Sequence, residues 1–353
     1  MFAVKYLDVQ KKIVPELLDI LNKRYNILTN IYYNQPIGRR MLASQLGMGE
    51  RIVRNEIDFF KKQGLIEINA DGMKVNYEGK QTLDSLKMFI HDLRGLSEME
   101  EFLRENLNLK HVLVVPGDVD ENELVLEEIG KSAANYLKSI LKDKNVIALT
   151  GGTSVKRLVD NMPKLNEYKN LLVLPARGGI GRNVEIQSNT LVAKLAEKLS
   201  ADYRMLQLID NVDYAEIYGI LDEESIKEVV QKIHKADILI YGIGKADEMA
   251  RKRGLKEKEI LRLKEKGAVG EAFGCYFNDN GKIVFSTPTA GIKGEDAKKI
   301  DKLIAIAGGK TKAEAILGVQ RYNQKNILIT DEGAAKEIIN IIKKEHNTTE
   351  TFN

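Results

Sequence analysis

The stretch Asn145-Val-Ile-Ala-Leu-Thr-Gly-Gly-Thr-Ser154 is a short apolar run that ends in glycines and hydroxyl side chains and then opens a helical pattern. A second run, Leu303-Ile-Ala-Ile-Ala-Gly-Gly-Lys-Thr-Lys312, ends in the same way. Glycines at the end of a strand let a ligand approach the backbone, and the start of the next helix offers unpaired N–H groups to an anion. We therefore expect parallel strands with anion-binding corners at their carboxyl ends.

Similar apolar runs recur from about residue 108 onward and are separated by helical patterns. This alternation is typical of a parallel sheet that is covered on both faces. The sequence therefore predicts a Rossmann-like α/β domain with a doubly wound, mostly parallel sheet. The expected strands are 111–115, 145–149, 170–174, 203–208, 237–241, 302–307 and 326–330, with one antiparallel hairpin formed by 275–277 and 283–285.

The first corner supplies four candidate ligand-binding residues. Gly151 and Gly152 permit close approach to the backbone, and Thr153 and Ser154 offer hydroxyl and N–H groups at a helix start. A Gly-Gly-Thr sequence by itself is more often only a tight turn. The corner becomes informative because several others are expected at the same edge of the sheet.

Two further candidates carry positive charge. Arg177 follows the strand expected at 170–174, and its planar guanidinium can hold a phosphate, although it could also be a surface arginine. Lys310 or Lys312 gives a second cationic centre, and two such centres suit a bisphosphorylated ligand better than a monophosphate. No corner has the spacing of a nucleoside triphosphate loop or a dinucleotide-binding motif, which disfavours nucleotides.

The length and composition of the chain limit the number of domains and the kinds of site that we expect. A chain of 353 residues suits two domains, and the single cysteine, Cys275, excludes an intramolecular disulfide and a cysteine-based zinc site. We find no apolar stretch long enough to span a bilayer and no signal-peptide pattern, so we expect a cytoplasmic protein without membrane contact.

Residues 1–90 carry 14 Lys and Arg against 10 Asp and Glu, a net +4, whereas the remainder carries 40 against 41. This modest excess of positive charge in the N-terminal part favours nucleic-acid binding by that part.

The N-terminal part has the pattern of a winged helix-turn-helix. Helices are expected at 17–33, 39–46 and 50–63, with a glycine turn at Gly47-Met-Gly49 and a hairpin around Asp71-Gly72 as the wing. In the third helix, Val53, Ile57 and Phe60 form a stripe that should be buried. Its other face and the wing supply the candidate DNA contacts, which are Arg51, Arg54, Asn55, Asp58, Lys62 and Lys74. The alternative is that these charges form a merely solvated face.

Residues 79–107 are expected to form one long helix. Its apolar residues, at heptad-like spacing, leave open whether it is a linker or a dimerisation helix.

Taken in order, several short motifs make the chain resemble the SorC/DeoR-type bacterial sugar regulators over nearly its whole length. They are Pro36-Ile-Gly-Arg-Arg40, Thr150-Gly-Gly-Thr153, Pro175-Ala-Arg-Gly-Gly179, Gly270-Glu-Ala-Phe-Gly274, Lys312-Ala-Glu-Ala315 and Thr330-Asp-Glu-Gly-Ala-Ala-Lys336. The resemblance implies a winged helix-turn-helix domain over 1–90, including Arg39 and Arg40 among its DNA contacts, and an effector domain over 91–353. That domain is implied to be related to sugar-phosphate isomerases and glucosamine-phosphate deaminases.

The resemblance also implies a function: a repressor of a glycolytic operon of the glyceraldehyde-3-phosphate dehydrogenase type, with fructose 1,6-bisphosphate as its effector. One phosphate would fall to the Gly151–Ser154 loop with Lys312. The remaining implied pocket residues are Arg177, Gln187, Lys252 or Arg253, and Glu271. The family has paired arginines where this chain has Arg251-Lys-Arg253, and a second threonine where it has Ser154. The implied partners are operator DNA and further copies of the chain, as a homodimer that forms a tetramer on DNA.

The rival hypothesis is a sugar-phosphate isomerase or deaminase, and another is a regulator of the same family that senses a different phosphorylated sugar. Isomerase or deaminase chemistry needs a general base beside the sugar. None of the four histidines lies at the carboxyl end of an expected strand, and the candidate carboxylates are Glu271, Asp331 and Glu332. Glu271 suits a hydrogen bond to a sugar hydroxyl, and Asp331 suits a cap of the last helix. We therefore expect no catalytic residue, metal or cofactor.

Overall fold

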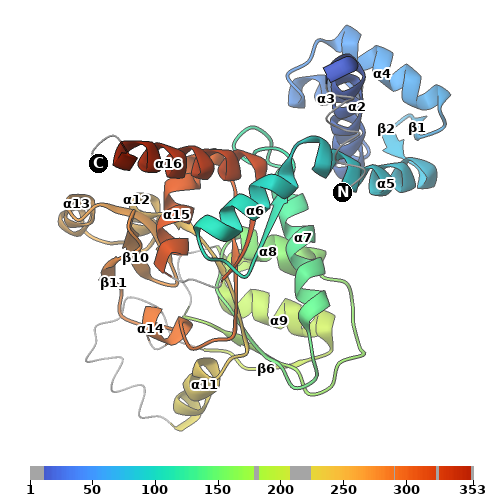
Figure 1. Cartoon of the computed structure of the whole chain (residues 1–353). Coiled ribbons are helices and arrows are strands. Elements are labelled where there is room, and N and C mark those ends of the chain that lie inside the picture. The colour runs from blue at the N-terminus through green and yellow to red at the C-terminus, as the bar shows by residue number, and fades with distance from the viewer. Residues whose placement is uncertain (1–11, 179–182, 207–223, 290, 323–325, 351–353) are drawn as a thin grey trace. The chain divides into compact units, whose positions relative to one another are not determined.

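The computed structural model describes residues 12–178, 183–206, 224–289, 291–322 and 326–350 (Figure 1). The chain forms two compact units, Met1–Ser97 and Glu98–Asn353. The boundary expected between residues 90 and 91 lies inside helix α5 (Tyr77–Leu93).

The first unit is a winged helix-turn-helix. Its elements before α5 are α2 (Pro15–Asn34), α3 (Arg39–Gln45), α4 (Glu50–Lys62), β1 (Ile66–Asn69) and β2 (Gly72–Val75). Gly47, with φ +60°, turns the chain between α3 and α4, as expected from the glycine-rich turn. Strands β1 and β2 pair antiparallel around the Asp71-Gly72 turn, and Ile37 bridges to Met73 on the outer side of β2. The predicted wing is confirmed.

The core of this unit is built on the predicted stripe of α4. Val53, Ile57 and Phe60 are buried and pack with Ile27 and Ile31 of α2. The 3.6-residue period of the helix places these side chains on one face and leaves the charged ones on the other.

The single helix expected over residues 79–107 is wrong, because two helices occupy this range. Helix α5 ends at Leu93, and α6 (Leu96–Asn106) starts after Gly95, which has φ +67°. A glycine adopts this left-handed conformation without the strain that a side chain would impose, so the chain can turn here.

The second unit is built on a seven-stranded sheet in the order β3-β13-β12-β7-β4-β5-β6, in which all neighbours are parallel. Each predicted strand is present, but 203–208 is wrong in extent. The strand there is β6, Asp202–Tyr203 only, an edge strand that pairs with β5 alone; residues 207 and 208 lie outside the described residues. The other strands are β3 (His111–Val115), β4 (Val146–Leu149), β5 (Leu172–Pro175), β7 (Ile238–Gly242), β12 (Lys302–Ile306) and β13 (Ile327–Asp331).

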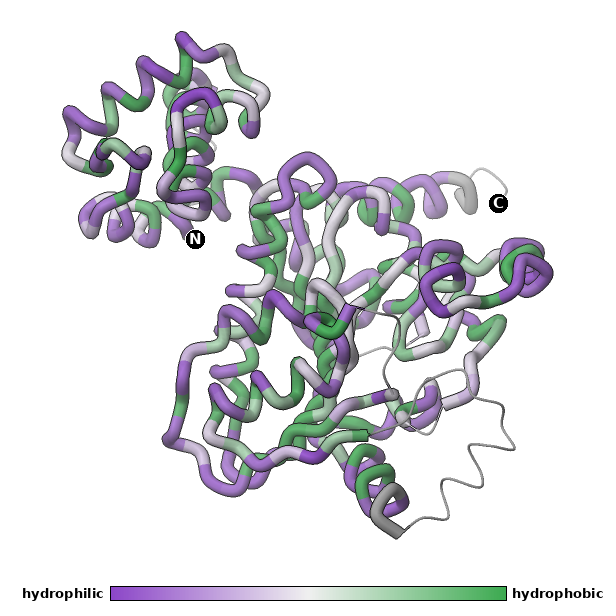
Figure 2. The backbone as a smooth tube through the Cα atoms, turned by 180° about the vertical axis from the view of Figure 1, so that it is seen from behind, coloured by the Kyte–Doolittle hydropathy of each residue, from purple (hydrophilic) through white to green (hydrophobic). Residues whose placement is uncertain are grey.

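Helices cover both faces of this sheet, as predicted. Ile238 and Ile240 of β7 pack in one core with α7 (Val125–Ile140), α8 (Thr153–Asn161) and α9 (Ser188–Leu199). The residues between them point to the opposite face, which is lined by other helices. These are α11 (Glu224–His234) and α16 (Glu332–Glu350), whereas α15 (Ala313–Tyr322) packs mainly on β9 (Ala268–Ala272) and β10 (Cys275–Asn278). In Figure 2 the strands in the middle of this unit are largely hydrophobic, and hydrophilic residues gather outside them.

A smaller antiparallel sheet is inserted between β7 and β12. Its order is β11-β10-β9-β8, so the predicted hairpin of β10 (Cys275–Asn278) and β11 (Ile283–Ser286) is confirmed. Sequence reasoning missed its two other strands. The remaining elements of the insert are β8 (Gly244–Lys245), α12 (Ala246–Lys252), α13 (Glu257–Glu265), β9 (Ala268–Ala272) and α14 (Gly294–Ala297).

Candidate ligand and DNA-binding sites

The strand order brings the predicted corners to one edge of the large sheet. Strands β12, β7, β4 and β5 are consecutive neighbours, so the residues that follow them lie side by side at their carboxyl ends. This edge is where open α/β sheets bind ligands.

The first corner lies between β4 and α8 and packs against the segment that leads into α9. The Gly152 N–H donates to the Ile186 carbonyl at 2.8 Å, and a Cβ on Gly151 would lie 2.5 Å from the same oxygen. Gln187 is the N-cap residue of α9 and therefore lies beside this corner. Ser188 Oγ donates to the Arg177 carbonyl at 2.9 Å, which ties the end of β5 to the same place.

The start of α8 has no side-chain cap within the described part of the chain. Thr153 is exposed and Ser154 is buried, and both belong to the first turn of this nine-residue helix. The first N–H groups of a helix have no partner within it and carry a partial positive charge. The corner is therefore equipped to accept an anion.

Arg177 is buried, so the alternative of a surface arginine is wrong. Its side chain donates to the Phe273 carbonyl and, at 3.0 Å, to Thr287 Oγ1, and the residue is 3% exposed. Gly274 lies against the guanidinium and leaves no space there for a Cβ. Arg177 thus joins the end of β5 to the turn between β9 and β10. Of the glycine-rich stretch that follows it, residues 179–182 lie outside the described residues.

Arg253 and Glu271 form a buried ion pair. Arg253 Nη2 lies 2.7 Å from Glu271 Oε1, and each side chain is 4% exposed. The Gly274 N–H donates to the same carboxylate oxygen at 2.5 Å. Lys252, the residue before Arg253, is exposed. Of the two candidates at this position, Arg253 holds Glu271 and Lys252 extends toward solvent.

The second corner, between β12 and α15, differs from the first because its backbone donors are occupied. It forms a short 3-10 helix, η2 (Lys310–Lys312), and the N–H groups of Gly309, Lys310 and Thr311 donate to carboxylates. The acceptors, in that order, are Asp331 at 2.8 Å, Asp118 at 3.2 Å and Asp120 at 2.7 Å. Asp331 also accepts from the Ala334 N–H, so its predicted role as a cap of the last helix is confirmed.

The two lysines of the second corner have different surroundings. The Lys310 side chain is mostly exposed and lies 3.8 Å from Glu337. Burial lowers the pKa of Lys312, the charges of Glu248 and Asp120 oppose that shift, and the charge of Lys252 adds to it. Lys312 and Lys252 therefore lie within electrostatic range of each other.

The predicted DNA-binding face is exposed. Its members on α3 and α4 are Arg39, Arg40, Arg51, Arg54, Asn55, Asp58 and Lys62. The Lys74 ammonium lies 2.8 Å from Asp71 in the wing, and this hydrogen bond lowers the pKa of the Asp71 carboxyl. Any phosphate contact of Lys74 thus competes with a neighbouring carboxylate.

Sequence reasoning missed Glu56, a buried acid on α4. Lys23 and Arg24 of α2 lie 2.6 Å and 2.9 Å from its carboxylate. Burial works to raise the pKa of Glu56, but the hydrogen bonds and charges of these two residues outweigh it, and the pKa is lowered. This contact fixes α4 against α2. The only signal in the sequence was an acid inside the apolar stripe.

Two features are absent from the described part of the chain. Within the described ranges, no cluster of three or more His, Cys, Asp or Glu side chains is arranged to hold a metal ion. No helix among those residues is both long enough and apolar enough to cross a membrane.

Two family models match the two parts of the chain. Residues 20–90 match the CggR N-terminal DNA-binding domain, and residues 91–340 match a sugar-binding domain. The chain is 39% identical over 333 residues to the central glycolytic genes regulator of Bacillus subtilis, covering 94% of this chain and 98% of that protein. It is 41% identical over 334 residues to the protein of the same name from Priestia megaterium, with the same coverage of 94% and 98%.

Solved structures agree with these matches. A SorC family transcriptional regulator from Enterococcus faecalis is 36% identical, covers 69% of this chain and 99% of its own, and has a TM-score of 0.64. The full-length sorbitol operon regulator SorC from Klebsiella pneumoniae covers 88% of this chain and 96% of its own, with a TM-score of 0.64. At 21% identity, the latter shows a shared fold alone.

These relatives are transcription regulators, so the prediction of a regulator rather than an enzyme is confirmed by the comparisons. A DNA-binding domain followed by a sugar-binding domain is also confirmed. The chain belongs to the SorC/DeoR-type family of sugar-binding transcription regulators.

Proposed function

We propose that this protein represses a glycolytic operon of the glyceraldehyde-3-phosphate dehydrogenase type in the cytoplasm, and that bound fructose 1,6-bisphosphate releases it from DNA or modulates its binding. The names of the relatives at 39% and 41% identity support the glycolytic target. The observation that carries the effector is the uncapped start of α8, which lies at the same sheet edge as Arg177 and Lys312.

In this proposal one phosphate of the effector binds the N–H groups and hydroxyls of Thr153 and Ser154. The other lies toward Lys312 and Lys252, whose charges act on each other. One strand, β7, separates β4 from β12. With a spacing of about 4.8 Å between strands, the two strand ends lie about 10 Å apart, which suits a ligand with a phosphate at each end.

Three buried side chains, Arg177, Arg253 and Glu271, form part of the wall of this site and are hydrogen-bonded to other residues of the protein. Arg177 is held by the β9–β10 turn, and Glu271 is held by Arg253. We propose that Gln187, which caps α9 beside the first corner, and the outer edge of the Arg177 guanidinium complete the pocket. A phosphate that arrives here competes with the hydrogen bonds of Arg177 and so acts on the turn at Phe273.

For DNA, we propose that α4 enters the major groove with Arg51, Arg54 and Asn55 toward the bases, while Arg39 and Arg40 contact phosphates. Arginine pairs with guanine edges and asparagine with adenine edges, and each such pair contributes about 1–3 kcal/mol of discrimination. The exposed position of all five side chains supports this assignment.

The effector is tested with the full chain and promoter DNA of the glyceraldehyde-3-phosphate dehydrogenase operon. Mobility shifts are recorded with fructose 1,6-bisphosphate, fructose 6-phosphate, glucose 6-phosphate and dihydroxyacetone phosphate. We expect only the bisphosphate to change the DNA complex and to raise the melting temperature by mass action. Release by a different sugar phosphate would contradict the effector, and an unbound promoter would contradict the target.

The DNA face is tested by Arg54→Ala. Loss of one base-contacting arginine should weaken promoter binding by about 1–3 kcal/mol, roughly 5- to 150-fold, and leave the affinity for the sugar phosphate unchanged. The control is Arg262→Ala, an exposed arginine on α13 in the other unit, which should bind the promoter normally. Equal promoter affinity of the two variants would contradict the role of α4.

A further inference from the structure

The first half of α2 exposes apolar side chains. Leu17 and Ile20 are 62% and 42% exposed, and Ile13, just before the helix, is 71% exposed. We call these three residues the α2 patch. Exposed leucine and isoleucine are common as single residues, but a cluster on one face marks a surface that another molecule covers.

The α2 patch continues the core face of the same helix. Ile20 lies seven residues before Ile27 and eleven before Ile31, spacings that return to the same side of an α-helix. Ile27 and Ile31 are fully buried in the winged-helix core. The helix is 20 residues long, and its buried positions all lie between residues 27 and 31. The first three turns therefore extend a core-type face beyond the core.

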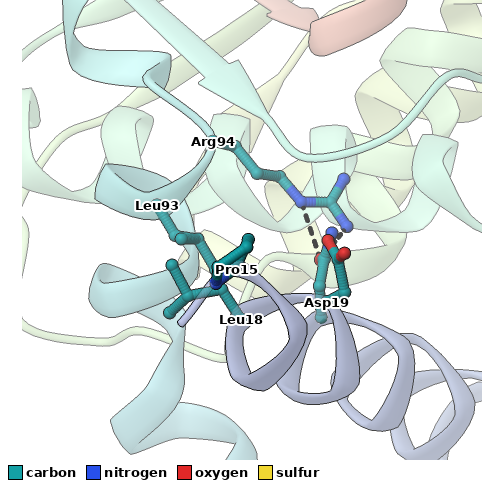
Figure 3. Close-up of a pocket in the computed structure, with 6 residues that line it drawn as sticks. Pro15, Leu18, Asp19, Leu93 and Arg94 are labelled. Carbon is teal, nitrogen blue, oxygen red and sulfur yellow. Dashed lines mark hydrogen bonds between the residues drawn. The ribbon is translucent and has the colours of Figure 1, made fainter. Parts of the chain in front are cut away.

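The opposite side of these turns faces the end of α5. Pro15 and Leu18 lie against Leu93 at the end of α5, around a small pocket that Arg94 also lines (Figure 3). Arg94 donates to Asn22 Oδ1 at 3.0 Å and to Asn26 Oδ1 at 3.1 Å. Helix α5 thus holds the start of α2 in place on one side while the α2 patch stays exposed.

We propose that the α2 patch binds the same patch of a second copy of this chain when two copies occupy adjacent half-sites on DNA. The inference rests on the proposed DNA binding. A two-fold axis makes such a contact self-complementary, with the two helices antiparallel. Dimers of helix-turn-helix proteins bind half-sites that are related in the same way.

The charges beside the patch fit an antiparallel pair. Glu16 and Lys23 are seven residues apart and flank the same edge of the patch. A two-fold axis between them therefore places Glu16 of each copy opposite Lys23 of the other. The Lys23 ammonium already contacts Glu56 at 2.6 Å, but it has three N–H donors and can serve a second carboxylate. The two helices would therefore be held by apolar contact and by two reciprocal ion pairs.

The small size of the patch predicts when the pairing forms. Three apolar side chains on each copy fall well short of the roughly 1,200 Å² that stable interfaces bury. Two copies fixed on neighbouring half-sites meet at a high effective concentration, and a weak contact then suffices. The pairing should contribute cooperativity on DNA and little association in free solution.

The test uses the full chain with Leu17→Cys and a short bismaleimide cross-linker, with and without promoter DNA. The natural Cys275 is buried and is present in every sample. The matched control is Met88→Cys, at a residue 79% exposed on α5 and outside the patch. We expect a covalent dimer from Leu17→Cys, in about tenfold higher yield on DNA, and little from Met88→Cys. Glu16→Lys in the Leu17→Cys protein should lower the yield by placing like charges opposite each other.

A second variant tests the same contact by the affinity for DNA. Leu17→Glu with Ile20→Glu should weaken binding to a fragment with two half-sites by about tenfold or more and leave binding to a single half-site unchanged. If DNA is bound but Leu17→Cys gives no dimer, the patch is covered by something other than a second copy and the inference is overturned. If the promoter is not bound, the proposed function fails. The pairing is then tested by the cross-link yield of Leu17→Cys without DNA at raised protein concentration, where a dimer supports it and the absence of a dimer contradicts it.

Discussion

The two glycine-rich corners at the ends of β4 and β12 share a sequence pattern but differ in what their backbone N–H groups bind. At Gly309–Thr311, three successive N–H groups donate to carboxylates of the protein itself. At Thr153, the first turn of α8 has no side-chain cap among the described residues. One corner is closed by internal anions, and the other is free to accept an anion from outside.

The difference arises from residues far away in the sequence. Asp118, in the loop after β3, accepts from Lys310, which is 192 residues later in the chain. A glycine pair at a strand end allows close approach, but the fold decides which partner approaches. The second corner instead contributes a side chain, Lys312, whose ammonium lies within electrostatic range of Lys252.

The largest effect should come from opening the closed corner with Asp331→Ala. Asp331 is fully buried and accepts from the N–H groups of Val119, Gly309 and Ala334, each at 2.8 Å. Leaving buried donors without a partner costs about 1–3 kcal/mol each, so we expect the free energy of unfolding to fall by about 3–5 kcal/mol in urea titrations. The control is Asp247→Ala, whose ion pair with Arg251 is exposed and contributes about 0–1 kcal/mol. Similar losses in the two variants would contradict this role of Asp331.

The open corner should be blocked by Gly151→Ala. The new Cβ would lie 2.5 Å from the Ile186 carbonyl oxygen and 3.2 Å from the Ser188 nitrogen, so the segment before α9 must move. We expect the affinity for fructose 1,6-bisphosphate, measured by calorimetry, to fall about 100-fold, since a misplaced binding segment costs about 2–3 kcal/mol. Gly49→Ala, in the DNA-binding unit, is the control, because nothing lies within 4 Å of the Cβ that it would add. Unchanged affinity in Gly151→Ala would show that the ligand binds elsewhere.

A matched pair of hydroxyl deletions compares the corners directly. Thr153→Val should lower effector affinity about tenfold, because a hydrogen bond to a charged group contributes about 1.5 kcal/mol. Thr311→Val removes a hydroxyl at the closed corner, where the backbone N–H of that residue is bound to Asp120, and should leave the affinity unchanged. The effector affinities of the two variants are measured by calorimetric titration. A larger loss in Thr311→Val than in Thr153→Val would show that the effector binds the second corner and not the first.

The smallest effect is a pH dependence that comes from Lys312. Burial lowers its pKa below the ordinary value of 10.5, so it loses its charge at a lower pH than an exposed lysine does. An anionic ligand binds the charged form, and effector affinity should therefore decline as the pH rises toward the alkaline range. Lys312→Arg stays charged at every accessible pH and should remove that decline. An identical pH profile for both proteins would exclude Lys312 from the pocket.

Patterns within single elements predicted the fold well. The apolar runs of β4, β7, β12 and β13 predicted the parallel sheet, and the stripe of Val53, Ile57 and Phe60 predicted the buried face of α4. The prediction was wrong where one residue decides the outcome. Gly95 stands between Leu93 and Leu96, which fit one helical period, and its left-handed backbone nevertheless separates two helices.

The site could be predicted only in part, because burial and pairing depend on contacts between distant elements. The sequence indicated Arg177 and the Gly151–Ser154 corner from their places at strand ends. It could not show that Arg177 is held by Phe273 and Thr287, or that Arg253 is paired with Glu271. Those partners come from the inserted sheet, of which only one hairpin had a clear turn signal.

The distinction between an open and a closed corner is tested most directly by a crystal structure of the full chain with fructose 1,6-bisphosphate. We predict one phosphate at the start of α8, within hydrogen-bond distance of the Thr153 and Ser154 N–H groups, and unchanged contacts of Asp118, Asp120 and Asp331 at the other corner. A phosphate that displaces those carboxylates and binds the N–H groups of Gly309–Thr311, with the start of α8 left vacant, would contradict it.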